Sequence, residues 1–162
     1  MSSKIIKPRN NSVNGWLVID KPQGISSFKV VSIIKHLLKP TKVGHAGTLD
    51  PEATGLLAVA LGEATKTITY QTDREKKYTF KVMWGKQTDT DDSEGNIIKE
   101  SKKRPKKSEI IDILSSFLGN LKQIPPNFSA KKVNGKKAYQ LARRGEFTDL
   151  KASEIQIFKL KL

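Results

Sequence analysis

The sequence predicts an α+β fold with a mixed, mostly antiparallel sheet flanked by helices. Two short runs rich in strand formers, residues 15–20 and 55–62, indicate strands. Apolar residues recur at helical spacing across residues 28–38, which indicates an amphipathic helix. An Asn-Gly pair inside the basic run 131–137 is typical of a tight hairpin turn. Helices that alternate with hairpin-connectable strands favour this class over a doubly wound parallel sheet.

The strongest helix signal follows the first strand. Residues 21–24 turn the chain, Ser26 or Ser27 is the expected N-cap of the helix, and Pro40 ends it. We expect its apolar residues to bury one face. These residues are Phe28, Val30, Val31, Ile33, Ile34, Leu37 and Leu38.

A short helix and a further strand are predicted in the middle of the chain. Residues 64–72 are expected to form the helix, and the small apolar residues of 55–62 before it indicate a buried strand. Residues 77–87 alternate at period two, so that Tyr78 and Phe80 lie on one face of the predicted strand.

Charged connections follow this strand. The acidic run 88–96 is predicted to be a solvated turn, because a calcium loop in either register lacks a required glycine or acid. The basic run 99–107 is either a solvated linker or a contact for nucleic acid. Ser108 is the expected cap of a helix that ends at Leu118.

The last part of the chain is predicted to mix extended and helical segments. Residues 124–130 are expected to be extended, and 131–137 to form a basic hairpin. Residues 138–144 fit a short helix that stops at Gly145. Residues 153–162 are strand-like up to the final residue, which leads us to expect a sequence that has been cut short.

Composition narrows the possible functions. The 162 residues carry a formal net charge of +14, with a pI of about 9.9, and can form one domain with a core. Lysine and arginine gather in runs, so a polyanionic partner is favoured over charge that serves solubility alone. The sequence has no cysteine, which excludes disulfides, thiolate nucleophiles and Cys-based zinc sites. His36 and His45 are too few for a histidine-rich metal site.

The N-terminal residues 1–13 are polar and basic and are expected to form a flexible arm. They contain no apolar segment of the signal-peptide type. No apolar run in the sequence is long enough to span a bilayer. We therefore expect a cytoplasmic protein that does not associate with membranes.

The run 44–55, Gly-His-Ala-Gly-Thr-Leu-Asp-Pro-Glu-Ala-Thr-Gly, is the most informative part of the chain. Pro51 fixes its own φ and pushes Asp50 away from helical geometry. The glycines permit backbone turns that other residues resist. We predict a rigid loop that presents Asp50 at its tip. A purely structural Asp-Pro turn is the alternative, and spacing alone would favour it.

Four segments, in order and with family-like spacing, resemble motifs of the TruB-type tRNA pseudouridine synthases. They match the opening motif, the catalytic motif, the motif after it and the RNA-gripping segment of that family. In this sequence they are residues 15–27, 43–51, 77–78 with 85–91, and 124–145. A single motif could mislead, but four in the expected order rarely would.

The resemblance implies a pseudouridine synthase-like catalytic domain that isomerises the T-loop uridine of tRNA. It assigns catalysis to Asp50 and so outweighs the structural alternative. Whether Asp50 attacks C1′, attacks C6 of the base or removes a sugar proton stays open. Lys21 and Pro22 are expected to brace the catalytic loop, a structural role and not a chemical one.

Substrate binding is implied for residues from three of the motifs. His45 would wedge into the RNA loop and Tyr78 would stack on the extruded uracil. A packed loop histidine and a core strand tyrosine are the alternatives for these two residues. Basic side chains of the gripping segment would contact phosphates, which fixes position rather than sequence. The complete set is His45, Tyr78, Gly47, Lys131, Lys132 and Arg143.

Two features of the family are missing from this sequence. The family's next strand carries an arginine that pairs with the catalytic aspartate, and a C-terminal PUA domain binds RNA. We therefore expect an N-terminal part of the enzyme, with residues 14–162 forming an incomplete catalytic domain. Within it, an RNA-gripping insertion is expected at about residues 124–150. Little turnover is expected from the chain by itself.

The resemblance also bears on cofactors and partners. Pseudouridine formation needs no cofactor and no metal, so neither is expected. The expected partner is the T-loop and T-stem of tRNA, and the protein is expected to be a monomer. Two alternatives remain open: a non-catalytic tRNA-binding chaperone, and a guide-RNA-dependent synthase that acts on rRNA.

Overall fold

The computed structural model describes residues 13–126, 131–133, 135–142, 144–146 and 150–162. Most of the predicted basic arm therefore lies outside the described residues. The chain divides into two compact units, Met1–Tyr78 and Thr79–Leu162.

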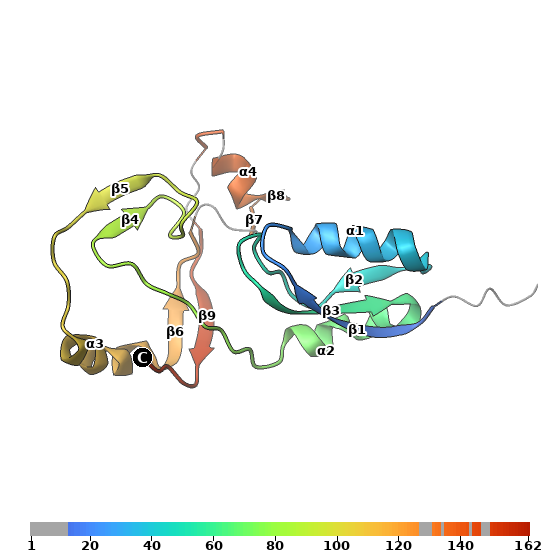
Figure 1. The fold of residues 1–162 in the computed structure, drawn as a ribbon, viewed down its shortest axis with the longest axis horizontal. Coiled ribbons are helices and arrows are strands. Elements are labelled where there is room, and N and C mark those ends of the chain that lie inside the picture. The colour runs from blue at the N-terminus through green and yellow to red at the C-terminus, as the bar shows by residue number, and fades with distance from the viewer. Residues whose placement is uncertain (1–12, 127–130, 134, 143, 147–149) are drawn as a thin grey trace, which may run out of the picture. The chain divides into compact units, whose positions relative to one another are not determined.

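The first unit is a three-stranded antiparallel sheet with a helix on one face (Figure 1). Strand β3 (Gly55–Leu61) lies between β1 (Gly15–Lys21) and β2 (Val43–His45). The β1–β3 register runs from Gly15 opposite Leu61 to Lys21 opposite Gly55. The two predicted strands are confirmed, whereas β2 was not expected.

Helix α1 (Ser27–Leu38) begins and ends as predicted. The Ser26 hydroxyl accepts a hydrogen bond from the Lys29 amide, so Ser26 is the N-cap. Lys39 has a left-handed backbone (φ 45°) and donates its amide to the Lys35 carbonyl, just before Pro40.

The core of this unit lies between α1 and β3. Val30 and Ile34 of α1 pack with three residues of β3: Leu57, Val59 and Leu61. The prediction of a wider buried face was wrong for four residues, because the narrow sheet covers only a stripe at i, i+4 spacing. The exposed residues are Phe28, Ile33, Leu37 and Leu38.

The predicted helix after β3 is confirmed as a 3₁₀ turn, η1 (Gly62–Thr67), followed by α2 (Ile68–Thr72). The predicted strand at 77–87 is wrong except for β4 (Lys86–Thr88). Tyr78 and Phe80 are about two-thirds exposed, at 65% and 67%. The alternation was real, but a strand also needs a hydrogen-bonded neighbour. No described strand pairs with residues 77–85.

The second unit opens with an antiparallel pair, β4 and β5 (Ile97–Glu100). The acidic run between them is a turn, as predicted. The Asp89 carboxylate accepts from the Asn96 amide at 2.9 Å, and the Asp92 carboxylate accepts from the Glu94 amide at 2.9 Å.

Helix α3 (Lys107–Leu114) and the 3₁₀ turn η2 (Ser115–Phe117) follow. The prediction that Ser108 caps α3 was wrong. Lys106 holds the N-cap position, and its amide donates to the Glu109 carboxylate at 2.6 Å. The acidic side chain thus occupies the positive end of the helix.

Strands β6 (Gly119–Gln123) and β9 (Ser153–Ile157) form an antiparallel pair. The predicted strand at 153–162 is therefore shorter than expected, and β6 was not predicted.

The predicted hairpin is confirmed as β7 (Lys132–Val133) and β8 (Lys136–Lys137), with Gly135 at φ 81°. Helix α4 (Ala138–Ala142) follows, and Gly145 has φ 75°. Residues 127–130 of the predicted extended segment lie outside the described residues. Every strand pair within the described ranges is antiparallel, which confirms the α+β class.

Candidate active site

The loop that carries Asp50 joins β2 to β3, and the sheet anchors both of its ends. His45 lies opposite Val59, and the Ala46 amide donates to the Ala58 carbonyl at 2.9 Å. The loop ends where Gly55 starts β3. Because both ends of the loop are anchored in one sheet, the loop has little freedom to move relative to that sheet.

Ser27 fixes the loop one residue before Asp50. Its hydroxyl donates to the Leu49 carbonyl and accepts from the Leu49 amide, each at 2.9 Å. The Ser27 residue is only 1% exposed. The first turn of α1 therefore holds both backbone groups of Leu49 through one side chain.

Lys21 fixes the loop one residue after Asp50. Its ammonium group donates to the carbonyls of Pro22 (2.9 Å), Ile25 (2.8 Å) and Pro51 (3.2 Å). The residue is fully buried, and these bonds use all three donors of the ammonium group. The Gly24 amide also donates to the Pro51 carbonyl, at 2.9 Å. The predicted bracing role of Lys21 is confirmed.

The Asp50 side chain stands apart from this network. The residue is exposed, and its backbone carbonyl accepts from the Ala53 amide at 3.1 Å. Within the described ranges, its carboxylate forms no hydrogen bond or ion pair. The backbone is therefore held on both sides of an acid whose oxygens remain available to a ligand.

His45 and Gly47 belong to the same loop as Asp50. The His45 ring is half-buried, and its Nδ1 donates to the Gly47 carbonyl. Because a carbonyl can only accept, Nδ1 is the protonated partner in this hydrogen bond. Gly47 has φ 132°, a conformation that side chains rarely adopt.

The other predicted site residues lie elsewhere in the chain. Tyr78 is the last residue of the first unit, and its side chain is exposed. The Lys131 ammonium is bonded to the Lys151 carbonyl and to the Ser153 hydroxyl. Lys132 lies in β7, and Arg143 lies outside the described residues.

Sequence reasoning missed the role of Ser27, which it considered only as a helix cap. The partner of Ser27 is 22 residues away, and no local pattern indicates such a contact. A second missed contact links the same two segments: the Gln23 amide group donates to the Glu52 carboxylate at 2.6 Å.

The described residues contain neither a membrane-spanning helix nor a metal-binding cluster. No helix there is both long and apolar enough to cross a membrane. No cluster of three or more His, Cys, Asp or Glu side chains there is placed to hold a metal ion.

Comparison with known proteins identifies the family. The sequence model of the TruB family pseudouridylate synthase (N-terminal domain) matches residues 35–162. The chain belongs to this family.

Relatives in the TruB family match almost the whole chain. The tRNA pseudouridine synthase B of Rhizobium johnstonii is 49% identical over 160 residues, which is 99% of this chain and 52% of the relative. The protein of the same name from Ruegeria pomeroyi is 51% identical over 154 residues, covering 95% and 51%. The chain thus spans about half the length of the curated relatives it matches.

Among solved structures, the chain is similar to a Cbf5–Nop10–Gar1 complex. The match has a TM-score of 0.49 and 28% identity. It covers 73% of this chain and 31% of the other.

Proposed function

We propose that this protein isomerises the T-loop uridine of tRNA to pseudouridine, with Asp50 as the catalytic carboxylate. One observation carries the proposal: Asp50 is exposed, its carboxylate has no partner among the described residues, and its loop backbone is held at Leu49 and Pro51. Family membership and the names of the relatives support the reaction class.

The reaction rearranges bonds within one nucleotide. The N1–C1′ bond breaks, the base turns, and a C5–C1′ bond forms. C5 loses its proton and N1 gains one, so that substrate and product are isomers. A carboxylate can serve as nucleophile or as proton acceptor in this sequence. Each of these roles needs an oxygen lone pair that is not occupied by the protein.

The clamped backbone provides the positioning that such chemistry needs. A reacting group contributes most when it is held in near-attack geometry, because the orientation cost is then met before the substrate arrives. Ser27 and Lys21 meet this requirement by rigid attachment to α1 and β1. Asp50 would therefore be oriented through its backbone, without a hydrogen bond from the described residues to its carboxylate.

Binding requires the target base to leave its stack, which costs a few kcal/mol. We assign the compensation for this cost to two residues: His45 would wedge into the RNA loop, and Tyr78 would stack on the extruded base. Stacking on an aromatic ring contributes about 1–3 kcal/mol per base. The exposure of Tyr78 suits this role better than a core role. His45 is half-buried on the same loop as Asp50, where it would meet the RNA.

The basic segment of the second unit is proposed as the RNA grip. The region from about 124 to 150 would contact backbone phosphates through Lys131, Lys132 and Arg143, within a catalytic domain that starts at residue 14. The formal charge of +14 supports a polyanionic ligand. We further propose that the protein works as a monomer in the cytoplasm.

The test uses the full-length product of the gene and a T-arm stem-loop RNA tritiated at C5 of the target uridine. Wild type should release tritium without any added RNA or protein. Asp50→Asn should lower the rate by more than about 10³-fold, as expected when a reacting group is removed. Asp73→Asn is the control, since it neutralises another exposed carboxylate of the same unit.

The outcomes separate the alternatives. Tritium release that needs a guide RNA would indicate the guided enzyme. RNA refolding without tritium release would indicate a chaperone. Equal rates for Asp50→Asn and wild type would exclude Asp50 as the catalytic group.

A further inference from the structure

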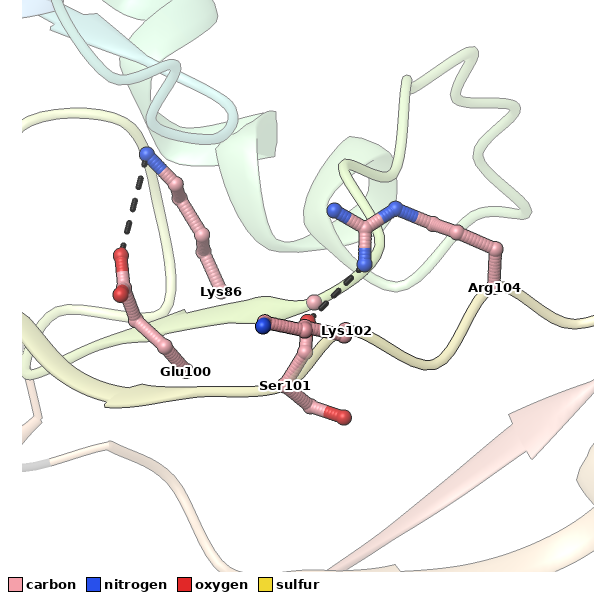
Figure 2. Close-up of a pocket in the computed structure, with 6 residues that line it drawn as sticks. Lys86, Glu100, Ser101, Lys102 and Arg104 are labelled. Carbon is pink, nitrogen blue, oxygen red and sulfur yellow. Dashed lines mark hydrogen bonds and ion pairs between the residues drawn. The ribbon is translucent and has the colours of Figure 1, made fainter.

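A surface hollow in the second unit lies outside the proposed active-site loop. It encloses about 340 Å³ between the end of β5 and the residues just before and at the start of β4 (Figure 2). Its lining residues are Gly85, Lys86, Glu100, Ser101, Lys102 and Arg104. None of them belongs to the predicted site, although residues 99–107 were singled out as a basic run.

Arg104 is held in place by the backbone. Its Nη1 donates to the Ser101 carbonyl at 2.9 Å and to the Lys103 carbonyl at 3.0 Å. The Ser101 hydroxyl accepts from the Lys103 amide at 3.1 Å, and the Ser101 amide donates to the Gly85 carbonyl at 2.9 Å. Figure 2 shows the guanidinium reaching back to Ser101.

This arrangement leaves one edge of the guanidinium free. Both hydrogens of Nη1 are occupied, whereas Nε and Nη2 form no hydrogen bond or ion pair with the described residues. These two nitrogens form the parallel N–H pair that binds two oxygens of a phosphate. The fork of Arg104 is thus oriented before any ligand arrives.

Gly85 allows the guanidinium to lie this close. A Cβ at Gly85 would lie 2.1 Å from Arg104 Nη1 and 2.4 Å from the Ser101 carbonyl oxygen. The Ser101 carbonyl oxygen belongs to the backbone and cannot move aside easily. The residue also has φ 90°, which disfavours a side chain.

The charge around the hollow is strongly positive. Residues 99–107 contain six lysines and arginines and one acid, Glu100. Glu100 pairs with Lys86 at 3.9 Å, with both side chains about half or more exposed (65% and 48%). Such an exposed pair contributes little, so Lys86 can turn to an anion at small cost.

We propose that this hollow binds a backbone phosphate of the RNA, with Arg104 as the bidentate ligand and Lys86 and Lys102 as supporting cations. Phosphodiester groups match the two free N–H donors of Arg104 in geometry and charge. The contact gives the enzyme a grip on RNA that is separate from the hairpin of residues 131–137. The RNA identity of the ligand rests on the proposed function.

The experiment measures affinity for a fluorescent T-arm stem-loop between 50 and 200 mM KCl, using the full-length protein. Arg104→Gln should make the slope of log affinity against log salt shallower by about 0.7–0.9, the value for one phosphate contact. Arg104→Lys should keep the slope near wild type but lower the affinity about threefold or more, because the charge stays and the fork is lost.

Lys103→Gln is the matched control. It removes the same charge from the neighbouring residue, which does not line the hollow, and its side chain plays no part in holding Arg104. It should change the slope by less than half as much. If Lys103→Gln and Arg104→Gln change the salt slope equally, the RNA responds to the overall positive charge of this segment and not to a specific site. That result would overturn the proposal.

A phosphate titration at constant ionic strength identifies the source of the ligand. Inorganic phosphate should compete with RNA weakly, and less in Arg104→Gln than in wild type. Tight phosphate binding, with RNA affinity unchanged in Arg104→Gln, would assign the hollow to a free phosphate compound. Wild type that does not bind RNA at all would refute the proposed function, whereas normal RNA binding by Arg104→Gln would refute only this site.

Discussion

Replacing Ser27 with alanine should loosen the Asp50 loop without disturbing the rest of the fold. The hydroxyl makes two hydrogen bonds to Leu49, and alanine leaves both backbone groups of Leu49 without their partner. A lost bond costs about 0.5–1.5 kcal/mol where water can replace it, and more where it cannot. Leu49 is half-buried, so we expect about 2 kcal/mol in total.

This change is measured at the Leu49 amide by hydrogen exchange. A loss of about 2 kcal/mol corresponds to roughly 30-fold faster exchange through local opening. Amides in the middle of β3 should keep their protection once the change in global stability is subtracted.

Ser26→Ala is the control, because it removes the N-cap bond to Lys29 and costs about 1 kcal/mol without touching the loop. Leu49 exchange should stay near the wild-type rate in that variant. If Leu49 exchanges at the wild-type rate in Ser27→Ala, or equally fast in both variants, Ser27 does not hold the loop.

Two further predictions concern the same unit. Lys21→Met leaves the carbonyls of Pro22 and Ile25 without this donor, at about 1–3 kcal/mol each, while Pro51 keeps its bond from the Gly24 amide. The urea midpoint should fall, and an unchanged midpoint would contradict the bracing role. The hydrogen bond and charge of Lys66 hold the pKa of the Glu63 carboxyl below its ordinary value. The resulting stabilisation is present above the unfolded-state pKa and is lost as the pH falls through the lower folded-state pKa. NMR titration of Glu63 should show a higher pKa in Lys66→Gln, and equal values would exclude this cause.

The parts of the fold that were predicted correctly have local causes. Helix α1 is marked by its cap and by Pro40, and β1 and β3 are marked by their strand formers. The prediction of a strand at 77–87 was wrong because alternation is a property of the segment alone, whereas a strand needs a hydrogen-bonded neighbour from another part of the chain. The predicted cap of α3 was wrong because the Glu109 carboxylate, and not the Ser108 hydroxyl, accepts the hydrogen bond at the start of the helix.

The same division applies to the site. The glycines and Pro51 predicted a stiff loop around Asp50, and a bracing role was expected of Lys21. The contact from Ser27 to Leu49 spans 22 residues and follows from how α1 packs on the sheet. Sequence periodicity places a helix on a sheet, but it does not say which hydroxyl will meet which backbone group.

If the clamped loop presents the Asp50 carboxylate to an extruded nucleoside, a crystal structure of the full-length protein with a T-arm stem-loop RNA should capture the two together. We predict a target uridine out of its stack, with its ribose or base within about 3–3.5 Å of an Asp50 oxygen. A bound uridine that remains stacked in the RNA, or lies out of reach of Asp50, would contradict the account.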